Sequence, residues 1–236
     1  WTRLIVLGRA MSMMAGMPQL VLVNPGLRSQ IAGGALAALP GASQLPEVHL
    51  GVETVSVAEA AASLALRFGA LVRNTQPVAV MPAGSSNAVL GCGLLARQLG
   101  LPVLRPNAGG DRDHHDTTHA LNSSLIDRVA DVLYTRAPDS HYALYKEGLL
   151  AERMVPVGNL AGDVLAALAP VCVGVVDKYF GNNAPLSWQR RAANGYVIVT
   201  AQLDDTDLGQ ARAAKLLATL QSVARDSAIL WPADEY

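Results

Sequence analysis

Short runs of aliphatic and β-branched residues alternate with amphipathic helical patterns along most of the chain. The runs occupy residues 4–7, 20–23, 78–81, 102–104, 132–134, 154–157 and 196–200. Such alternation is typical of right-handed βαβ units around a parallel sheet. We therefore expect an α/β fold in which helices cover a sheet of parallel strands.

The central segment, residues 76–127, combines two of these strands with two polar connections. A strand at 78–81 leads into the turn 82–87 and a helix, and a strand at 102–104 leads into the polar loop 105–116. In parallel sheets, ligands bind in the crevice outside the carboxyl ends of the strands. We expect part of any functional site at these two connections.

Helix signals accompany the strands. Ser56 and Glu59 have the spacing of a capping box, and Ala61, Leu64, Phe68 and Leu71 then recur at helical intervals. Further helices are predicted at residues 121–130 and 160–169, with a short one between them that begins at Asp139 or Ser140. These apolar faces are interpreted as core.

A change of composition suggests two domains. Residues 177–194 are rich in polar, aromatic and turn-forming residues, which is typical of a domain junction. We predict an N-terminal Rossmann-like domain at 1–170, a linker at 171–194 and the beginning of a second Rossmann-like domain at 195–236. One strand, one helix and one strand form half of such a domain, so a further C-terminal segment is expected.

Charge and cysteine content argue against several functional classes. The formal net charge is -1, which disfavours partners such as nucleic acid or an anionic membrane surface. The apolar run 164–176 contains Pro170 and is too short to span a bilayer. Cys92 and Cys172 lack metal-ligand spacing, and sparse free thiols favour a cytoplasmic protein. The turn at Gly8 lacks a G-x-G-x-x-G motif, so no dinucleotide cofactor is implied.

The polar loop carries most of the chemistry-bearing side chains. The acidic and histidine residues in and after it are Asp111, Asp113, His114, His115, Asp116 and His119. Histidine with carboxylate can bind a divalent metal, but adjacent histidines tend to point apart, and no metal is predicted. His119, Asp116 and His115 are the candidate catalytic residues, Arg112 is a candidate for substrate binding, and a solvated loop is the alternative.

Ser85 and Ser86 precede a helix that begins near Asn87. Their hydroxyls, together with the free N–H groups of a helix N-terminus, could hold a phosphate or a sugar hydroxyl. An ordinary N-cap accounts for a serine at this place equally well. Both interpretations stay open.

Several short motifs occur in a characteristic order. They are Gly84-Ser-Ser-Asn87, Leu99-Gly-Leu-Pro-Val103, Asn107-Ala-Gly109, Asp127-Arg-Val-Ala-Asp131 and Gly158-Asn159 followed by Asp163. In this order the chain resembles the non-hydrolysing UDP-N-acetylglucosamine 2-epimerases. The resemblance implies two Rossmann-like domains in a GT-B arrangement and a UDP-sugar as ligand.

The resemblance also implies which groups should carry the reaction. The family removes a proton at carbon 2 of the sugar, eliminates UDP and adds it back, which needs ionisable groups on both sides of the ring. In this chain Ser85 occupies the position of the family's aspartate, Asn107 that of a glutamate and Gln202 that of a histidine. Residues 118–120 occupy the positions of its paired glutamates. His119 alone among them could still act as an acid or base. Arg9 is expected to contact the diphosphate, after a first strand that ends at Gly8.

Three functions follow from this pattern. The first is a divergent UDP-N-acetylglucosamine 2-epimerase with substituted acid and base positions. The second is a GT-B glycosyltransferase that uses a UDP-sugar or another nucleotide-sugar donor, because an inverting transfer needs a single base. The third is a non-catalytic homologue that binds a nucleotide sugar or pairs with an active paralogue. A homodimer is the assembly expected from the resemblance.

Overall fold

The structure is a computed structural model that describes residues 2–26, 39, 41–52, 56–110, 117–180, 195–199 and 207–230. The chain divides into two compact units, Trp1–Val171 and Cys172–Tyr236. The division predicted above, with a linker at 171–194, stays a prediction.

In the first unit, helices alternate with short strands. In chain order the elements are α1 (Thr2–Ser12), β1 (Leu22–Asn24), the 3₁₀ helix η1 (Ala42–Gln44), β2 (Glu47–His49), α3 (Val57–Thr75), α4 (Asn87–Gln98), β3 (Leu104–Ala108), α5 (Thr117–Val129), β4 (Val132–Thr135), α6 (Pro138–Lys146), the 3₁₀ helix η2 (Ala151–Arg153), β5 (Met154–Pro156) and α7 (Leu160–Phe180), which continues into the second unit.

All strand pairs in this unit are parallel among the residues described. β1 pairs with β2, and β4 lies between β3 and β5. Val80 adds a parallel bridge to Val103 on the free side of β3, where the Val80 N–H donates to Pro102 O and Leu104 N–H donates to Val80 O. The expected α/β fold with parallel strands is confirmed.

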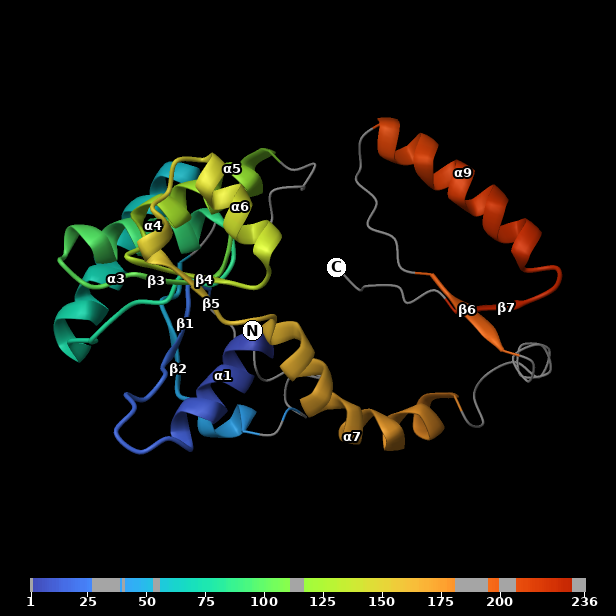
Figure 1. The fold of residues 1–236 in the computed structure, drawn as a ribbon, viewed down its shortest axis with the longest axis horizontal. Coiled ribbons are helices and arrows are strands. Elements are labelled where there is room, and N and C mark those ends of the chain that lie inside the picture. Colours follow the sequence, from blue (N-terminus) through green and yellow to red (C-terminus); the bar gives the residue numbers. More distant parts are fainter. Residues whose placement is uncertain are drawn as a thin grey trace. The chain divides into compact units, whose positions relative to one another are not determined.

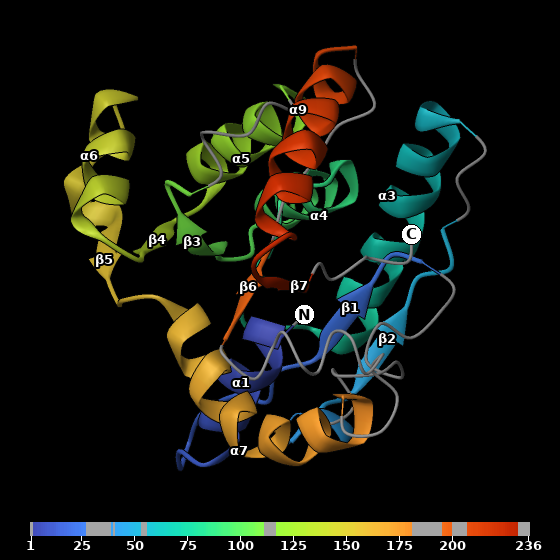
Figure 2. The same ribbon diagram turned by 90° about the vertical axis from the view of Figure 1, so that its right-hand side faces the viewer.

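The main core lies between these strands and the helices α3, α4 and α5, which pack side by side (Figures 1 and 2). Leu64 and Phe68 from α3, Ala96 from α4 and Leu133 from β4 are buried there. The predicted α3 face is confirmed at Leu64 and Phe68, whereas Ala61 is exposed. Burying side chains of this size is the dominant favourable term in folding.

The predicted capping box at the start of α3 is present in a modified form. Glu59 N–H donates to Ser56 Oγ over 3.2 Å, as expected. The Ser56 hydroxyl in turn donates to Glu59 Oε2 over 2.7 Å, so the glutamate closes the box through the hydroxyl. Ser56 is thus the N-cap that satisfies an orphan N–H of the first turn.

The strand predicted at residues 4–7 is wrong, because these residues belong to helix α1. Ile5 and Gly8, three positions apart, form the buried side of this helix. A Cβ on Gly8 would lie 2.7 Å from Leu45 Cδ2, which explains a glycine within the helix. A short apolar run cannot separate strand from helix by periodicity, and here packing decided for the helix.

Helix α1 has a small core of its own. Ile5, Leu22, Leu39 and Ala42 are buried together, and two α7 residues, Ala167 and Leu168, pack against them. The buried side of α1 therefore packs against side chains of both β1 and α7.

Other element boundaries also differ from the expectation. The predicted strand at 78–81 is a single bridge at Val80, and β3 takes in residues 105–108, which were expected in the polar loop. α6 begins after Ala137 with Pro138 in its first turn, so neither Asp139 nor Ser140 is the cap. α5 begins at Thr117 and α7 runs to Phe180, both beyond the predicted bounds.

The second unit contains one parallel βαβ arrangement in its described part. β6 (Tyr196–Ile198) pairs in parallel with β7 (Ala228–Leu230), and α9 (Asp207–Val223) lies between them in the chain. Ala228 is buried and the three β6 residues are exposed. The strand predicted at 196–200 is confirmed at Tyr196–Ile198.

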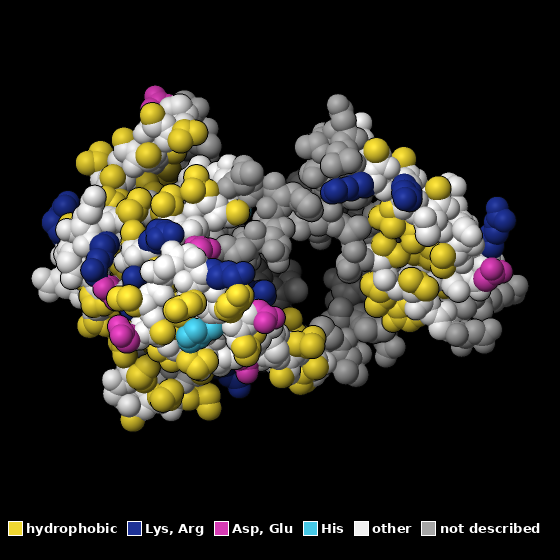
Figure 3. All heavy atoms as spheres, turned by 45° about the horizontal axis from the view of Figure 1, so that its top comes forward, with side chains coloured by type: hydrophobic (Ala, Val, Ile, Leu, Met, Phe, Trp, Pro, Cys, Tyr) yellow, Lys and Arg dark blue, Asp and Glu magenta, His cyan; other side chains and the backbone are white. Residues whose placement is uncertain are grey.

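The described surface mixes both signs of charge with apolar side chains. On the face shown in Figure 3, basic and acidic side chains are interspersed among hydrophobic ones. Among the residues that the structure describes, no helix combines the length and apolar character needed to cross a membrane.

Candidate functional site

Two turns lie side by side at the carboxyl ends of the Val80 segment and β3. The first, residues 82–86, leads from the Val80 bridge into α4, and the second, residues 107–110, follows β3. Each turn is linked by hydrogen bonds to side chains of α5. The structure therefore brings together the two connections that were expected to carry the site.

A buried ion pair lies beneath both turns. Arg105 is 1% exposed and Asp127 is 0% exposed, and Arg105 Nε donates to Asp127 Oδ1 over 3.0 Å. Arg105 Nη1 also donates to Pro82 O over 2.9 Å and to Gly84 O over 2.7 Å. The second carboxylate oxygen, Asp127 Oδ2, accepts from Gly109 N–H over 3.0 Å. The pair therefore hydrogen-bonds to the first turn through Arg105 and to the second through Asp127.

Helix α5 turns a polar stripe toward this pair and the two turns. The stripe is made of residues at helical spacing: His119, Asn122, Ser123 and Asp127. Asn122 Nδ2 donates to Ser85 O over 3.0 Å and to Asn87 Oδ1 over 2.8 Å. Ser123 Oγ accepts from Arg105 Nη2 over 3.2 Å and donates to Gly110 O over 3.4 Å. The polar groups on this buried face are thus hydrogen-bonded, as burial requires.

Ser85 and His119 are in contact at the N-terminal end of the stripe. Ser85 Oγ lies 3.3 Å from His119 Nδ1, and Ser85 is 9% exposed while His119 is exposed. The imidazole tautomer decides which of the two atoms donates. Imidazole is a side chain that can serve as a general acid or base.

Ser86 is the N-cap of α4. Its Oγ accepts from Val89 N–H over 3.3 Å, and its own backbone is extended. The N-cap interpretation of Ser86 is therefore confirmed, and a phosphate contact at Ser85 or Ser86 stays a prediction.

Asn107 holds an uncommon backbone conformation at the end of β3. Its φ is 56°, in the left-handed region, and the β3–β4 register shifts between Arg105 and Ala108. Asparagine tolerates this region better than other residues with a side chain. Irregular strand ends of this kind are common beside binding sites.

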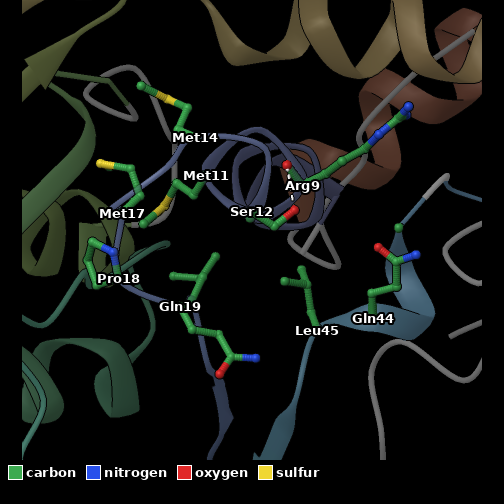
Figure 4. Close-up of a pocket in the computed structure, with 12 residues that line it drawn as sticks. Arg9, Met11, Ser12, Met14, Met17, Pro18, Gln19, Gln44 and Leu45 are labelled. Carbon is green, nitrogen blue, oxygen red and sulfur yellow. Dashed lines mark hydrogen bonds between the residues drawn. The ribbon is translucent and has the colours of Figure 1, made fainter.

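Arg9 lies in a different environment from Ser85 and His119. It belongs to α1, where its carbonyl accepts from Ser12 Oγ over 2.8 Å. It borders a cavity of about 140 Å³ that Met11, Met14 and Met17 also line (Figure 4). The premise for Arg9, a strand ending at Gly8, is wrong, and its contact with a diphosphate stays a prediction.

The remaining predicted site residues, Arg112, His115, Asp116 and Gln202, lie outside the described residues. Within the described part of the chain, no three His, Cys, Asp or Glu side chains are grouped closely enough to hold a metal ion.

Sequence reasoning missed the buried members of the site. The sequence places Arg105 in the polar loop 105–116 without a partner, and it marks Asp127 only as part of a motif. A signal was available, because an arginine directly after the apolar residues Val103 and Leu104 needs a buried partner if the strand continues. The polar residues at helical spacing in α5 were a second signal.

Comparison with protein-family models identifies the family of this chain. Residues 35–235 match the family model of UDP-N-acetylglucosamine 2-epimerase. Among curated proteins, sequence comparison finds no match.

Solved structures with a similar fold include two UDP-GlcNAc 2-epimerases. The Neisseria meningitidis UDP-GlcNAc 2-epimerase bound to UDP-GlcNAc has a TM-score of 0.79 at 14% identity, with 98% of this chain and 62% of that chain covered. The Methanocaldococcus jannaschii enzyme in complex with UDP-GlcNAc and UDP has a TM-score of 0.70 at 15% identity, covering 98% and 62%. Staphylococcus aureus MnaA with UDP has a TM-score of 0.72 at 16% identity, covering 99% and 59%.

The chain therefore spans about three fifths of the length of these structures. Their similarity confirms the α/β, GT-B-like fold class expected from the sequence motifs.

Proposed function

Because the chain belongs to the UDP-N-acetylglucosamine 2-epimerase family, we propose that it handles a nucleotide-activated sugar, with His119 as the acid or base. The ligand would bind over the turns 82–86 and 107–110. The observation that carries this proposal is the 3.3 Å approach of Ser85 Oγ to His119 Nδ1.

The described side chains at the two turns favour a reaction that needs a single acid or base group. Epimerisation, as the resemblance implies it, needs proton exchange on both faces of the sugar ring. The proposed equivalents of the family's acidic residues are Ser85 and Asn107, and neither a hydroxyl nor an amide exchanges protons readily near neutral pH. Asp127 is buried in its ion pair with Arg105, which leaves the exposed His119 as the described group at the two turns that can take a proton from a ligand or give one to it.

In this proposal Ser85 orients the imidazole. If His119 is protonated, both ring nitrogens carry a proton, so Nδ1 donates to Ser85 Oγ and Nε2 can act as an acid toward a ligand. If Nδ1 carries the proton and donates to Ser85 Oγ, Nε2 is a base. In both protonation states Nδ1–H donates to Ser85 Oγ, and Nε2 can give or take one proton on one side of a bound sugar.

A second function, glycosyl transfer, is favoured by the same observation. An inverting transfer from a UDP-sugar or another nucleotide-sugar donor needs one base near the acceptor hydroxyl, and His119 would supply it. A non-catalytic binding protein, alone as a homodimer or paired with a paralogue, is expected to bind the nucleotide sugar without turnover. A cytoplasmic location also stays a prediction.

The test is proton NMR of the protein with UDP-N-acetylglucosamine in deuterated water. An epimerase exchanges deuterium into carbon 2 and forms the manno epimer, whereas a transferase or binding protein gives saturation-transfer signals without exchange. Loss of both exchange and binding would contradict the proposal.

His119→Ala tests the assigned residue in the same assay. We expect turnover to fall by at least about a hundredfold with the fold retained. His141→Ala, which alters a histidine on α6, is the matched control and should keep the wild-type rate. An unchanged rate in His119→Ala would remove this residue from the mechanism.

A further inference from the structure

The ion pair Arg105–Asp127 does more than fill space beneath the site. Moving two charges out of water is costly, and apolar residues of similar volume often give equal or greater stability. A core at this place could therefore do without the pair. What an apolar pair cannot provide is the set of directed hydrogen bonds that the two side chains make.

Those bonds go to the parts of the backbone that shape the site. Arg105 donates to the carbonyls of Pro82 and Gly84, which lie three residues and one residue before Ser85. Asp127 accepts from the N–H of Gly109, which follows the left-handed Asn107 by two residues. Each partner thus hydrogen-bonds to one of the two turns, and the 3.0 Å contact between them links the turns to each other.

The planar guanidinium sets the direction of these bonds. Nε points to the carboxylate, Nη1 to two carbonyl oxygens and Nη2 to Ser123 Oγ. A lysine has the same charge but lacks this fixed fork, so it cannot replace all of these bonds at once. The geometry therefore depends on arginine and not merely on positive charge.

We propose that Arg105 and Asp127 are positioning residues, which hold the turns 82–86 and 107–110 so that Ser85 stays in contact with His119. His119 and Asp127 lie on the same stripe of α5. The Arg105–Asp127 pair therefore fixes the position of this helix relative to the first turn. The consequence for ligand binding rests on the proposed function, whereas the effect on the Ser85–His119 contact does not.

The decisive variant replaces both charges by apolar residues, Arg105→Met with Asp127→Leu. We expect it to fold, since no charge is left unpaired, but with a lower thermal midpoint, because the Pro82 and Gly84 carbonyls and the Gly109 N–H lose their partners. We also expect it to lose the Ser85–His119 contact, because the turn carbonyls no longer have their donor.

The readout is the ¹⁵N resonance of the His119 ring in histidine-labelled protein, assigned with His119→Gln. Ser85→Ala defines the spectrum of a ring without its serine. The double variant should give the ring shifts of Ser85→Ala and weaken UDP-N-acetylglucosamine binding by roughly tenfold, the equivalent of one charged hydrogen bond. A folded double variant with wild-type ring shifts would overturn the proposal.

Arg105→Lys decides the matter if the double variant does not fold. It keeps the charge beside Asp127 but not the fork, and its ring shifts should move toward those of Ser85→Ala. Wild-type shifts in this variant would also overturn the proposal. Arg97→Lys is the matched control, because Arg97 pairs with Asp131 at an exposed position away from both turns.

The two hypotheses can fail separately. If the wild-type protein does not bind UDP-N-acetylglucosamine, the proposed function fails. The ring shifts still report whether Arg105 and Asp127 hold Ser85 against His119, because that measurement needs no ligand.

Discussion

Ser85 and His119 are 34 residues apart in the chain, yet Ser85 Oγ lies 3.3 Å from His119 Nδ1. Asn122 supports this contact from α5 by donating to Ser85 O. Different residues therefore hold the backbone of the site and provide its imidazole. Buried polar side chains hold the backbone in place, and an exposed imidazole faces solvent.

Gly109 is a position where even one methyl group should be harmful. Its φ is +70°, and a Cβ would lie 2.5 Å from the backbone oxygen of Ser140. We expect Gly109→Ala to lower the free energy of unfolding by about 2 kcal/mol or more, from backbone strain and overpacking together. Urea denaturation measures this change.

Gly158→Ala is the matched control for Gly109→Ala. Gly158 has a similar φ of +87°, but a Cβ there would meet nothing within 4 Å. This variant should therefore show the strain alone, about 1 kcal/mol. Equal losses in the two variants would contradict the predicted clash with α6.

Ser86 allows the cap to be separated from a ligand contact. Ser86→Ala removes the acceptor for Val89 N–H and should cost about 1 kcal/mol of stability. Ser86→Asp supplies another good N-cap and should keep the thermal midpoint. If Ser86 also contacts a phosphate, the aspartate should weaken UDP binding through charge repulsion, which titration calorimetry measures; unchanged affinity would leave the cap as its only role.

At the scale of elements, α5 organises the site. Its stripe of His119, Asn122, Ser123 and Asp127 faces the two turns, while Ile126 on the same side is fully buried. A helix packed through hydrogen bonds of defined direction has fewer acceptable positions than one packed through apolar contacts alone. The stripe therefore gives the site a single geometry at the cost of burying polar groups.

Cys92 in helix α4 should make the stability of the fold depend on pH. Burial raises the pKa of the Cys92 thiol from 9.0 to about 12. Because the folded state favours the neutral thiol, its contribution to stability is complete below pH 9 and is lost as the pH rises toward 12. The free energy of unfolding should fall across this window.

The comparison that isolates Cys92 is Cys92→Ala, since tyrosine and lysine side chains also titrate in this range. Urea midpoints measured from pH 8 to pH 10.5 should decline more steeply for the wild type than for the variant. Parallel declines would mean that Cys92 ionises without opposing the fold.

At the scale of the whole molecule, the two compact units differ in how much they bury. Both hydrophobic clusters found among the described residues belong to the first unit, including the contacts from Ala167 and Leu168 of α7. In the second unit the β6 residues are exposed. The first unit should therefore account for most of the stability of the chain.

A fragment of residues 1–180, which keeps α7 entire, should unfold cooperatively with a thermal midpoint within a few degrees of the full chain. A fragment of residues 172–236 should lack a cooperative transition, because the described β6 residues are exposed and only Ala228 of β7 is buried. Circular dichroism on heating checks both. A non-cooperative fragment 1–180 would mean that the second unit is needed for the first to fold.

Much of the fold could be predicted because its signals are local. The cap at Ser56, the strands around Leu133 and Met154, and the parallel arrangement follow from side-chain spacing and from the connections between elements. The family motifs also marked both turns of the site. Residues 4–7 were misassigned because four apolar residues suit a strand or a buried helix equally.

The amino-acid sequence by itself determined the α/β class, the parallel pairing of the strands and the two turns at the carboxyl ends of the Val80 segment and β3. Only the tertiary structure decided that Arg105 pairs with Asp127 and that Ser85 meets His119. The physical reason is that a buried charge is acceptable only beside its partner, and these partners are 22 residues apart in the chain. Spacing along the chain does not encode such contacts, because they depend on how α5 packs against the sheet.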